Sequence, residues 1–297
     1  MFDKLLKLNK KIKSKIYFDY DVGKLTWFRT GGKSKVFIIV ENEEELEILI
    51  NNISEFNYLI VGAASNLLVR DKGYNGVIIK LGKNFNNIQI KEDYVEVGAS
   101  ILDINLAKYA KYNLINDFEF FSGIPGSIGG AIKMNAGCFG FETKDILNKV
   151  IFFDSAGKKN EVNADTINLK YRSSNLKDSD IITSAKFKLS YGDKHIIEDR
   201  LSTIKLQRES KQPIKEKTSG STFKNPLNNF AAKLIEESGC KGMESGDAIV
   251  SLKHSNFLIN RGKATATDIE NLGHKIIEKV FKKFNILLEW EIRVVGE

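Results

Sequence analysis

Residues 121–140 read FSGIPGSIGGAIKMNAGCFG, and this stretch decides how the rest of the chain is interpreted. Six of the chain's 23 glycines lie here. Glycine permits positive φ angles and lets the backbone approach a ligand closely. Apolar residues stand between the glycines, and Lys133 is the only charged residue, whereas flexible linkers are polar. The composition therefore predicts a buried loop whose backbone N–H groups face an anionic ligand.

The glycine spacing excludes two common phosphate-binding motifs. The Gly-x-Gly-x-x-Gly order of dinucleotide-binding folds is absent, and no Gly-Lys-Ser/Thr follows as it would in a Walker loop. A second small-residue turn, Gly62 to Asn66, comes directly after an apolar segment. It could donate N–H groups to a phosphate, although a plain tight turn explains it equally well.

Composition limits the class of protein. The chain has 297 residues, enough for two or three domains, with 45 Lys and Arg against 38 Asp and Glu. The lysines are scattered among acidic residues, which favours a solvated basic surface over a nucleic-acid site. No apolar run approaches a membrane span, and the N-terminus lacks the core of a signal peptide. We expect a cytoplasmic protein whose two cysteines are reduced and form no metal site.

Hydrophobic periodicity predicts helices and strands in a mixed, α+β order. The predicted N-terminal caps are Asn42, Ser100 and Thr267, the last in a capping box with Glu270. Predicted helices cover about residues 3–15, 43–53, 100–110, 196–208, 227–238 and 267–284. Predicted strands cover residues 36–40, 58–61, 77–80, 87–90, 94–97, 150–153, 161–162, 181–190, 248–252, 256–260 and 287–295.

Three further stretches carry chemistry-bearing side chains. Arg172 stands between Tyr171 and two serines, a setting suited to clamping a carboxylate or phosphate, although it could be a surface cation. Residues 219–226 form a turn rich in hydroxyl groups that Pro226 ends. In the last predicted strand Glu289, Glu291 and Arg293 share one face, which faces either solvent or a cleft.

Taken in order, the motifs resemble the UDP-N-acetylenolpyruvoylglucosamine reductase family of peptidoglycan synthesis. The resemblance extends from about Thr26 to the end of the chain, and seven ordered motifs make it specific. They are residues 25–32, 62–66, 123–137, 171–174, 220–226, 253–257 and 289–293.

The resemblance implies a fold and a division into domains. An FAD-binding domain of the vanillyl-alcohol-oxidase (PCMH) type, built from two α/β subdomains, would be followed by a smaller α+β substrate-binding domain. The expected boundaries are residues 1–22 for a lead-in helix, 23–192 for the FAD-binding domain, 193–212 for a connecting helix and 213–297 for the substrate-binding domain. The FAD-binding subdomains would cover about residues 23–82 and 83–192.

The resemblance also implies a reaction. NADPH would reduce non-covalently bound FAD, and the flavin would pass a hydride to UDP-N-acetyl-3-O-(1-carboxyvinyl)-glucosamine, giving UDP-N-acetylmuramate. We expect a monomer that acts on these small molecules and binds neither nucleic acid nor membrane. Another oxidoreductase on the same flavin fold, and more remotely a non-enzymatic basic binding protein, are the alternatives.

The family positions fall on particular residues of this chain. Arg172 and Glu291 would stabilise the enolate, and Ser221 would donate the proton, assisted by Lys224 or water. A carboxyl beside a carboxylate helps only when it is protonated. The expected substrate-binding residues are Tyr171, Lys224, Asn225, Arg208 and His254. The expected cofactor-binding residues are Arg29, Gly62, Ala63, Ala64, Ser65, Asn66, Gly123, Ile124, Pro125, Gly126, Ser127, Gly129, Gly130, Ala131 and Asn135.

Three departures from the family pattern stand out. Ala64 occupies a position that is usually glycine, and Trp290 one that is often proline. Ser221 follows Arg172 by only 49 residues, which resembles the shorter class that lacks an inserted tyrosine-bearing loop.

Overall fold

The computed structural model describes residues 2–297, and their contacts divide into two compact units. Unit 1 comprises the residues up to 19 together with 35–63 and 76–206. Unit 2 comprises residues 20–34, 64–75 and 207–297. Two short N-terminal segments therefore group with the C-terminal part of the chain, which the predicted domain boundaries did not anticipate; those boundaries stay a prediction.

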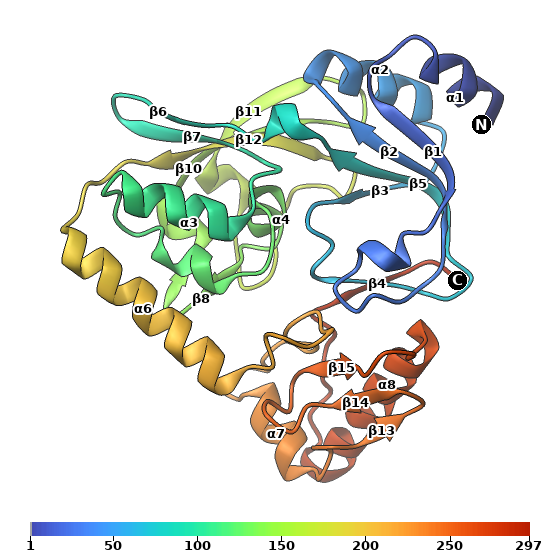
Figure 1. Cartoon of the computed structure of the whole chain (residues 1–297), viewed down its shortest axis with the longest axis vertical. Helices are drawn as coiled ribbons and strands as arrows, with labels where there is room; N and C mark the ends of the chain where they lie inside the picture. Colours follow the sequence, from blue (N-terminus) through green and yellow to red (C-terminus); the bar gives the residue numbers. More distant parts are fainter. Residues whose placement is uncertain (1) are drawn as a thin grey trace. The chain divides into compact units, whose positions relative to one another are not determined.

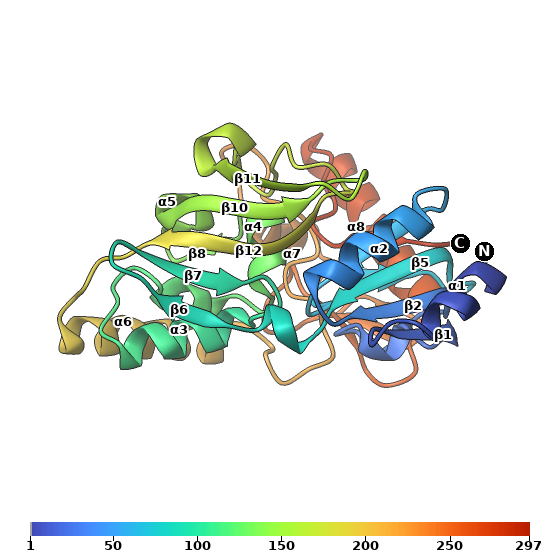
Figure 2. The same ribbon diagram turned by 90° about the horizontal axis from the view of Figure 1, so that it is seen from above.

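Two sheets form the framework of unit 1 (Figures 1 and 2). The first has the order β1-β2-β5-β3, with β3 and β5 parallel. The second has the order β11-β10-β12-β7-β6 and is antiparallel. The strands are β1 (Lys15–Tyr20), β2 (Ser34–Val40), β3 (Tyr58–Val61), β5 (Tyr74–Leu81), β6 (Ile88–Ile90), β7 (Tyr94–Gly98), β10 (Leu147–Phe153), β11 (Lys159–Asn163) and β12 (Ile181–Lys188).

Helices cover these sheets and carry the glycine-rich stretch. Helix α2 begins after Asn42, whose Oδ1 accepts from the N–H of Glu45, so this predicted cap is confirmed. Lys111 and Glu198 form an ion pair of 3.2 Å that joins α3 to α6. The helices are α1 (Phe2–Asn9), α2 (Glu43–Ile53), α3 (Asp103–Tyr112), α4 (Ile128–Lys133), α5 (Thr143–Ile146) and α6 (Lys194–Lys211).

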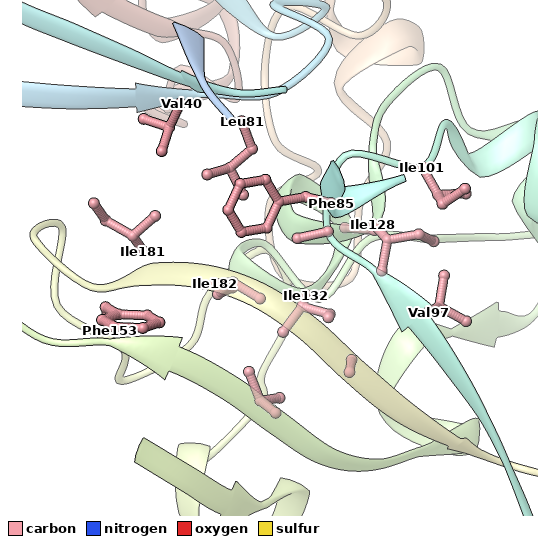
Figure 3. Close-up of a cluster of buried hydrophobic side chains, with 14 of the residues drawn as sticks. Val40, Leu81, Phe85, Val97, Ile101, Ile128, Ile132, Phe153, Ile181 and Ile182 are labelled. Carbon is pink, nitrogen blue, oxygen red and sulfur yellow. The ribbon is translucent and has the colours of Figure 1, made fainter. Parts of the chain in front are cut away.

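The glycine-rich stretch is anchored in the core of unit 1. Figure 3 shows Ile128 and Ile132 of α4 among side chains from both sheets, including Val97 of β7 and Ile182 of β12. Ile128 and Ile132 are fully buried, and each contributes about 1.5–3 kcal/mol through its burial. The prediction of a buried loop holds only in part: residues such as Ser127, Ile128, Ala131, Ile132 and Asn135 are buried, but most others in the stretch are partly exposed and Gly130, Phe139 and Gly140 are exposed. Residues 128–133 also form a short helix rather than a continuous loop.

Unit 2 is built on a small antiparallel sheet covered by two helices. The sheet has the order β13 (Glu244–Ser245), β14 (Ala248–Val250) and β15 (Leu258–Asn260). Helices α7 (Ala231–Glu237) and α8 (Ala266–Phe284) complete the fold, and α8 lies along the sheet in Figure 1. The C-terminal β16 (Arg293–Val295) pairs in parallel with β4 (Leu67–Val69), which draws residues 64–75 into this unit.

Two helix predictions in unit 1 were wrong. The N-terminal helix ends at Asn9 instead of Lys15, because the N–H groups of Lys13 and Ser14 turn to donate to the Glu45 carboxylate and the chain enters β1. Ser100 does not cap α3, because its hydroxyl donates to Gly82 O at 3.1 Å. Leu102 is the N-cap of α3 and offers no side-chain cap.

Three predictions in unit 2 also need correction. The capping box of α8 is Thr265 with Asp268, because Thr267 bonds Asp71 and Glu270 pairs with Arg70. Helix α7 begins at Ala231 rather than Leu227. In the predicted last strand only residues 293–295 pair with a neighbouring strand. Residues 289–292 instead form backbone hydrogen bonds with Thr222 and Lys224. Within residues 2–297 no helix is both long and apolar enough to cross a membrane.

Candidate active site

Gly62 and the glycine-rich stretch meet in unit 1. A Cβ atom at Gly62 would lie 2.0 Å from the Ser127 hydroxyl oxygen, so only glycine allows this approach. A Cβ at Gly126 would lie 2.5 Å from Asp103 Oδ2, and one at Gly129 would crowd Ala99. The two turns that were predicted separately as anion-binding elements are therefore neighbours, and close packing accounts for Gly62, Gly126 and Gly129.

Backbone N–H groups of the glycine-rich stretch divide into two sets. Those of Ile128 and Gly129 donate to Ile101 O and Ala99 O at 2.9 Å, which fixes the segment on the strand–helix connection before α3. Within residues 2–297, the N–H groups of Gly126, Ser127 and Gly130 have no protein acceptor. Three neighbouring N–H groups without a protein acceptor suit the oxygens of a diphosphate.

Arg172 is held beside the same stretch. Lys170 and Ser173 exchange backbone hydrogen bonds of 3.0 and 3.1 Å, and Arg172 at the tip of this turn has a φ of +54°. Its guanidinium stacks over the Tyr171 ring, 4.9 Å from the centroid, and donates to Gly137 O at 3.3 Å. A left-handed conformation for a bulky residue is strained, and such strain concentrates at functional sites.

Asn135 connects the glycine-rich stretch to the Arg172 turn. Its amide donates to Lys170 O at 3.2 Å and to the Glu142 carboxylate at 3.1 Å, and its Oδ1 accepts from Lys144 N at 3.0 Å. The side chain is fully buried and the residue has a φ of +43°. These bonds position the backbone around Asn135, and the cofactor contact that the sequence predicts for this residue stays a prediction.

Ser221 and Glu291 lie on adjacent extended segments of unit 2. The N–H of Glu291 donates to Thr222 O at 2.8 Å, and that of Lys224 donates to Glu289 O at 2.9 Å. Both the Ser221 and the Glu291 side chains are half-buried. The candidate proton donor and the candidate carboxylate are thus brought together by backbone pairing, although 70 residues separate them in sequence.

Asn66, from the small-residue turn, joins this pair. Its side-chain amide donates to Glu291 O at 2.9 Å, and its main-chain carbonyl accepts from Arg293 N at 2.9 Å. The sequence predicted Asn66 only as a cofactor contact and gave no signal for this link, because β4 and β16 are distant in sequence. Asn66 therefore couples the predicted phosphate turn to the carboxylate-bearing segment.

The structure shows the surroundings of both positions that depart from the family pattern. Ala64 has a φ of +52°, a left-handed conformation that glycine adopts freely and alanine adopts only with strain. This conformation explains why glycine is usual at this position. Trp290 packs against Phe223 with tilted rings whose centroids are 5.0 Å apart, and it reaches Gly273 of α8, where a Cβ would lie 2.0 Å from its ring. These contacts anchor Trp290, which directly precedes Glu291.

Five further predicted site residues make contacts within unit 2. Burial lowers the pKa of His254, whose Nδ1 accepts from Asn256 N at 3.3 Å. Arg29 is exposed, and its guanidinium donates to Lys24 O at 2.6 Å. The Lys224 ammonium forms an ion pair with Glu289 at 3.3 Å, and Asn225 Oδ1 accepts from Ala231 N at 3.0 Å. The Arg208 guanidinium donates to Gln212 Oε1 at 3.2 Å.

Asp103 is a residue that the sequence placed only in a helix start. Its carboxyl is fully buried behind Gly126, and neither oxygen has a hydrogen-bond partner in the described part of the chain. Burial raises the pKa of Asp103 well above its ordinary value, because desolvation disfavours the charged carboxylate. No sequence pattern distinguishes such a residue from an exposed helix N-terminal aspartate.

The fold and site define a class, and comparison with known proteins then defines the family. Residues 34–162 match the FAD binding domain family, and residues 212–295 match the C-terminal domain of UDP-N-acetylenolpyruvoylglucosamine reductase. The predicted α+β fold, with an FAD-binding domain followed by a second α+β domain, is confirmed.

Relatives extend the match to nearly the whole chain. The UDP-N-acetylenolpyruvoylglucosamine reductase of Rickettsia massiliae is 43% identical over 286 residues, covering 96% of this chain and 97% of the relative. That of Rickettsia bellii is 42% identical over 288 residues, covering 96% and 95%. The crystal structure of the Thermus caldophilus enzyme superposes with a TM-score of 0.84 at 33% identity, covering 96% of this chain and 99% of that one. The chain belongs to the UDP-N-acetylenolpyruvoylglucosamine reductase family.

Proposed function

We propose that this protein is an NADPH-dependent flavoenzyme that reduces UDP-N-acetyl-3-O-(1-carboxyvinyl)-glucosamine to UDP-N-acetylmuramate in peptidoglycan synthesis. The observation that carries the proposal is a family match that spans both the FAD-binding and the C-terminal domain, at 43% identity over 96% of the chain. The enzyme is accordingly an oxidoreductase, the UDP-N-acetylmuramate dehydrogenase.

FAD would be held non-covalently by the two neighbouring glycine turns. The Gly126, Ser127 and Gly130 N–H groups would donate to its diphosphate, and the Gly62–Ser127 contact keeps both turns close enough to share one ligand. Bound FAD supplies the hydride transfer that links NADPH oxidation to reduction of the enolpyruvyl group. The other predicted FAD contacts, from Arg29 to Asn135, remain part of this proposal.

Arg172 and Glu291 would stabilise the charge that develops beside the substrate carboxylate. Reduction at the methylene carbon places negative charge on the neighbouring carbon and its carboxylate, and a fixed guanidinium lowers the energy of that charge. Stacking on Tyr171 and the bond to Gly137 O preorganise the Arg172 guanidinium. Glu291 assists in its protonated form, since an ionised carboxylate would repel the developing charge.

Ser221 would deliver the proton that completes the reduction. A serine hydroxyl is a weak acid, so a cationic neighbour or water must support proton loss. Lys224 follows in the same turn and is held by Glu289, which restricts its ammonium group to this region. Tyr171, Lys224, Asn225, Arg208 and His254 are the proposed substrate-binding residues, of which Asn225 also caps α7 through its Oδ1.

Cellular location, assembly and functional domains complete the proposal. We infer a cytoplasmic monomer in which residues 23–192 bind FAD and residues 213–297 bind the sugar nucleotide, joined by residues 193–212. A small soluble sugar nucleotide as substrate favours this location. Sedimentation equilibrium at several protein concentrations tests the monomer: a constant mass near 33.5 kDa is expected.

An anaerobic visible spectrum tests the function directly. NADPH should bleach the flavin absorbance of the purified holoenzyme, and UDP-GlcNAc-enolpyruvate should then restore it in the absence of oxygen. A flavin that bleaches and stays reduced would retain the cofactor and refute the substrate. A protein that binds no FAD even when FAD is added would refute the proposal as a whole.

A further inference from the structure

We propose that Asn256 is a positioning residue that holds the turn carrying Ser221 in the register needed for proton donation. The inference rests on the proposed role of Ser221. Asn256 lies just before β15 and is only 3% exposed. Its side chain faces the backbone of Phe223.

Three hydrogen bonds join Asn256 to the Ser221 turn. Its Oδ1 accepts from Phe223 N at 3.0 Å, its Nδ2 donates to Phe223 O at 2.8 Å, and its main-chain carbonyl accepts from Thr222 N at 2.8 Å. An asparagine side chain carries both a donor and an acceptor, so it can occupy both backbone groups of one residue. Neither leucine nor aspartate at this position could reproduce the pair.

Asn256 acts at the place where regular pairing stops. Strand β15 begins at Leu258, and just before it Phe257 forms an isolated bridge with Ser221. On the opposite edge, Thr222 O accepts from Glu291 N at 2.8 Å. The Asn256 amide therefore fixes the Ser221 turn against the Glu291 segment, and its loss would free the turn to shift by one bonded position.

Asn260 provides a matched control on the same stretch of chain. It is 2% exposed, its Nδ2 donates to Phe28 O at 2.8 Å, and its Oδ1 accepts from Gly262 N and Ala264 N at 2.8 and 2.9 Å. On substitution by alanine Asn260 loses three side-chain hydrogen bonds and Asn256 loses two, and none of those of Asn260 reaches the Ser221 turn. A general loss of stability would affect both variants alike.

The test measures the two half-reactions separately in FAD-loaded Asn256→Ala, Asn260→Ala and Ser221→Ala holoenzymes under anaerobic stopped flow. Asn256→Ala should slow substrate-driven reoxidation by roughly 10- to 100-fold, the range expected for a misplaced catalytic group. Flavin reduction by NADPH should stay within about twofold of the wild type. In the Ser221→Ala background, adding Asn256→Ala should slow reoxidation little further, because the two act as one unit.

Each alternative result has a distinct meaning. Reoxidation of Asn256→Ala within about twofold of Asn260→Ala, or equal slowing of both half-reactions, would overturn the inference. If Ser221→Ala reoxidises normally, the proposed role of Ser221 fails and the inference falls with it. Should Asn256→Ala not fold, Asn256→Asp retains the acceptor for Phe223 N, loses the donor to Phe223 O, and must show the same selective loss.

Discussion

At the residue scale, Ala64 combines a left-handed backbone with a side chain that disfavours it. Its φ of +52° costs an L-residue about 1–2 kcal/mol, which is the reason that glycine is usual at this point of the turn. Asn66, two residues later, donates a hydrogen bond to the backbone of Glu291. The strained residue therefore lies close in sequence to a residue that contacts the proposed site.

Ala64→Gly should raise the free energy of unfolding by about 0.5–1 kcal/mol, because relief of the strain exceeds the added freedom of the unfolded chain. Urea denaturation measures this difference. Ala63→Gly is the control, since Ala63 has no positive φ and its substitution should lower stability instead. A loss of stability in both variants would contradict the explanation of the Ala64 position.

Ser221→Ala should leave NADPH-driven flavin reduction within about twofold of the wild type and slow substrate-driven reoxidation by roughly a hundredfold or more. The removed hydroxyl is the proposed proton source, whereas reduction of the flavin does not need it. Stopped-flow absorbance under anaerobic conditions separates the two steps. Ser219→Ala, a buried serine in the same turn, should leave both steps intact, and an equal loss in the two variants would point to a structural role.

Asp103→Asn should change the pH dependence of stability. Because burial raises the pKa of Asp103, the native state holds its proton more tightly than the unfolded state, whose pKa is about 3.9. The contribution of Asp103 to the free energy of unfolding of the wild type is fully present below about pH 4, and it is lost as the pH rises through the native pKa. Asparagine does not titrate, so the variant should gain on the wild type by about 1.4 kcal/mol per pH unit within that window.

Urea unfolding of Asp103→Asn and wild type between pH 5 and pH 8 checks this trend. The exposed Asp93→Asn serves as the control and should track the wild type at every pH. A stability difference between Asp103→Asn and wild type that is constant with pH would show that Asp103 is ionised in the native protein.

At the element scale, helix α8 supports the segment that carries Glu291. Its amphipathic face buries Ile269, Leu272, Ile276 and Val280, and Gly273 on the same helix accommodates the Trp290 ring. Trp290 in turn packs on Phe223, so the segments of Ser221 and Glu291 share one aromatic support.

Gly273→Ala should destabilise the protein by about 1–3 kcal/mol, although alanine favours a helix interior by about 1 kcal/mol over glycine. The added Cβ would meet the Trp290 ring at 2.0 Å and force it to move. A double-mutant cycle provides the control: in a Trp290→Ala background the same substitution should become neutral or stabilising. Destabilisation of equal size in both backgrounds would exclude the clash as its cause.

Element prediction succeeded where local chemistry decides and failed where distant contacts decide. Asn42 caps α2 as its sequence context indicates. For α8, two overlapping boxes fit the same pattern, and the choice of Thr265 follows from Asp71 and Arg70, which occupy Thr267 and Glu270. The early end of α1 likewise depends on Glu45, more than thirty residues further along the chain.

At the scale of the whole molecule, the order of motifs indicated the family, the FAD-binding domain and the reaction, because each motif is short and local. The grouping of residues 20–34 and 64–75 with the C-terminal part could not be predicted, since it depends on the parallel pairing of β4 with β16. The same pairing places Asn66 beside Glu291, so the distant contact that escaped prediction also shapes the proposed site.

The most direct test of the central claim is a balance of reactants and products in one vessel. FAD-loaded enzyme is mixed anaerobically with NADPH and UDP-GlcNAc-enolpyruvate, NADPH loss is followed by absorbance, and the sugar nucleotides are identified by mass spectrometry. We expect one UDP-N-acetylmuramate, two hydrogens heavier than the substrate, for each NADPH oxidised. Oxidation of NADPH that requires oxygen and leaves the sugar nucleotide unchanged would contradict the account.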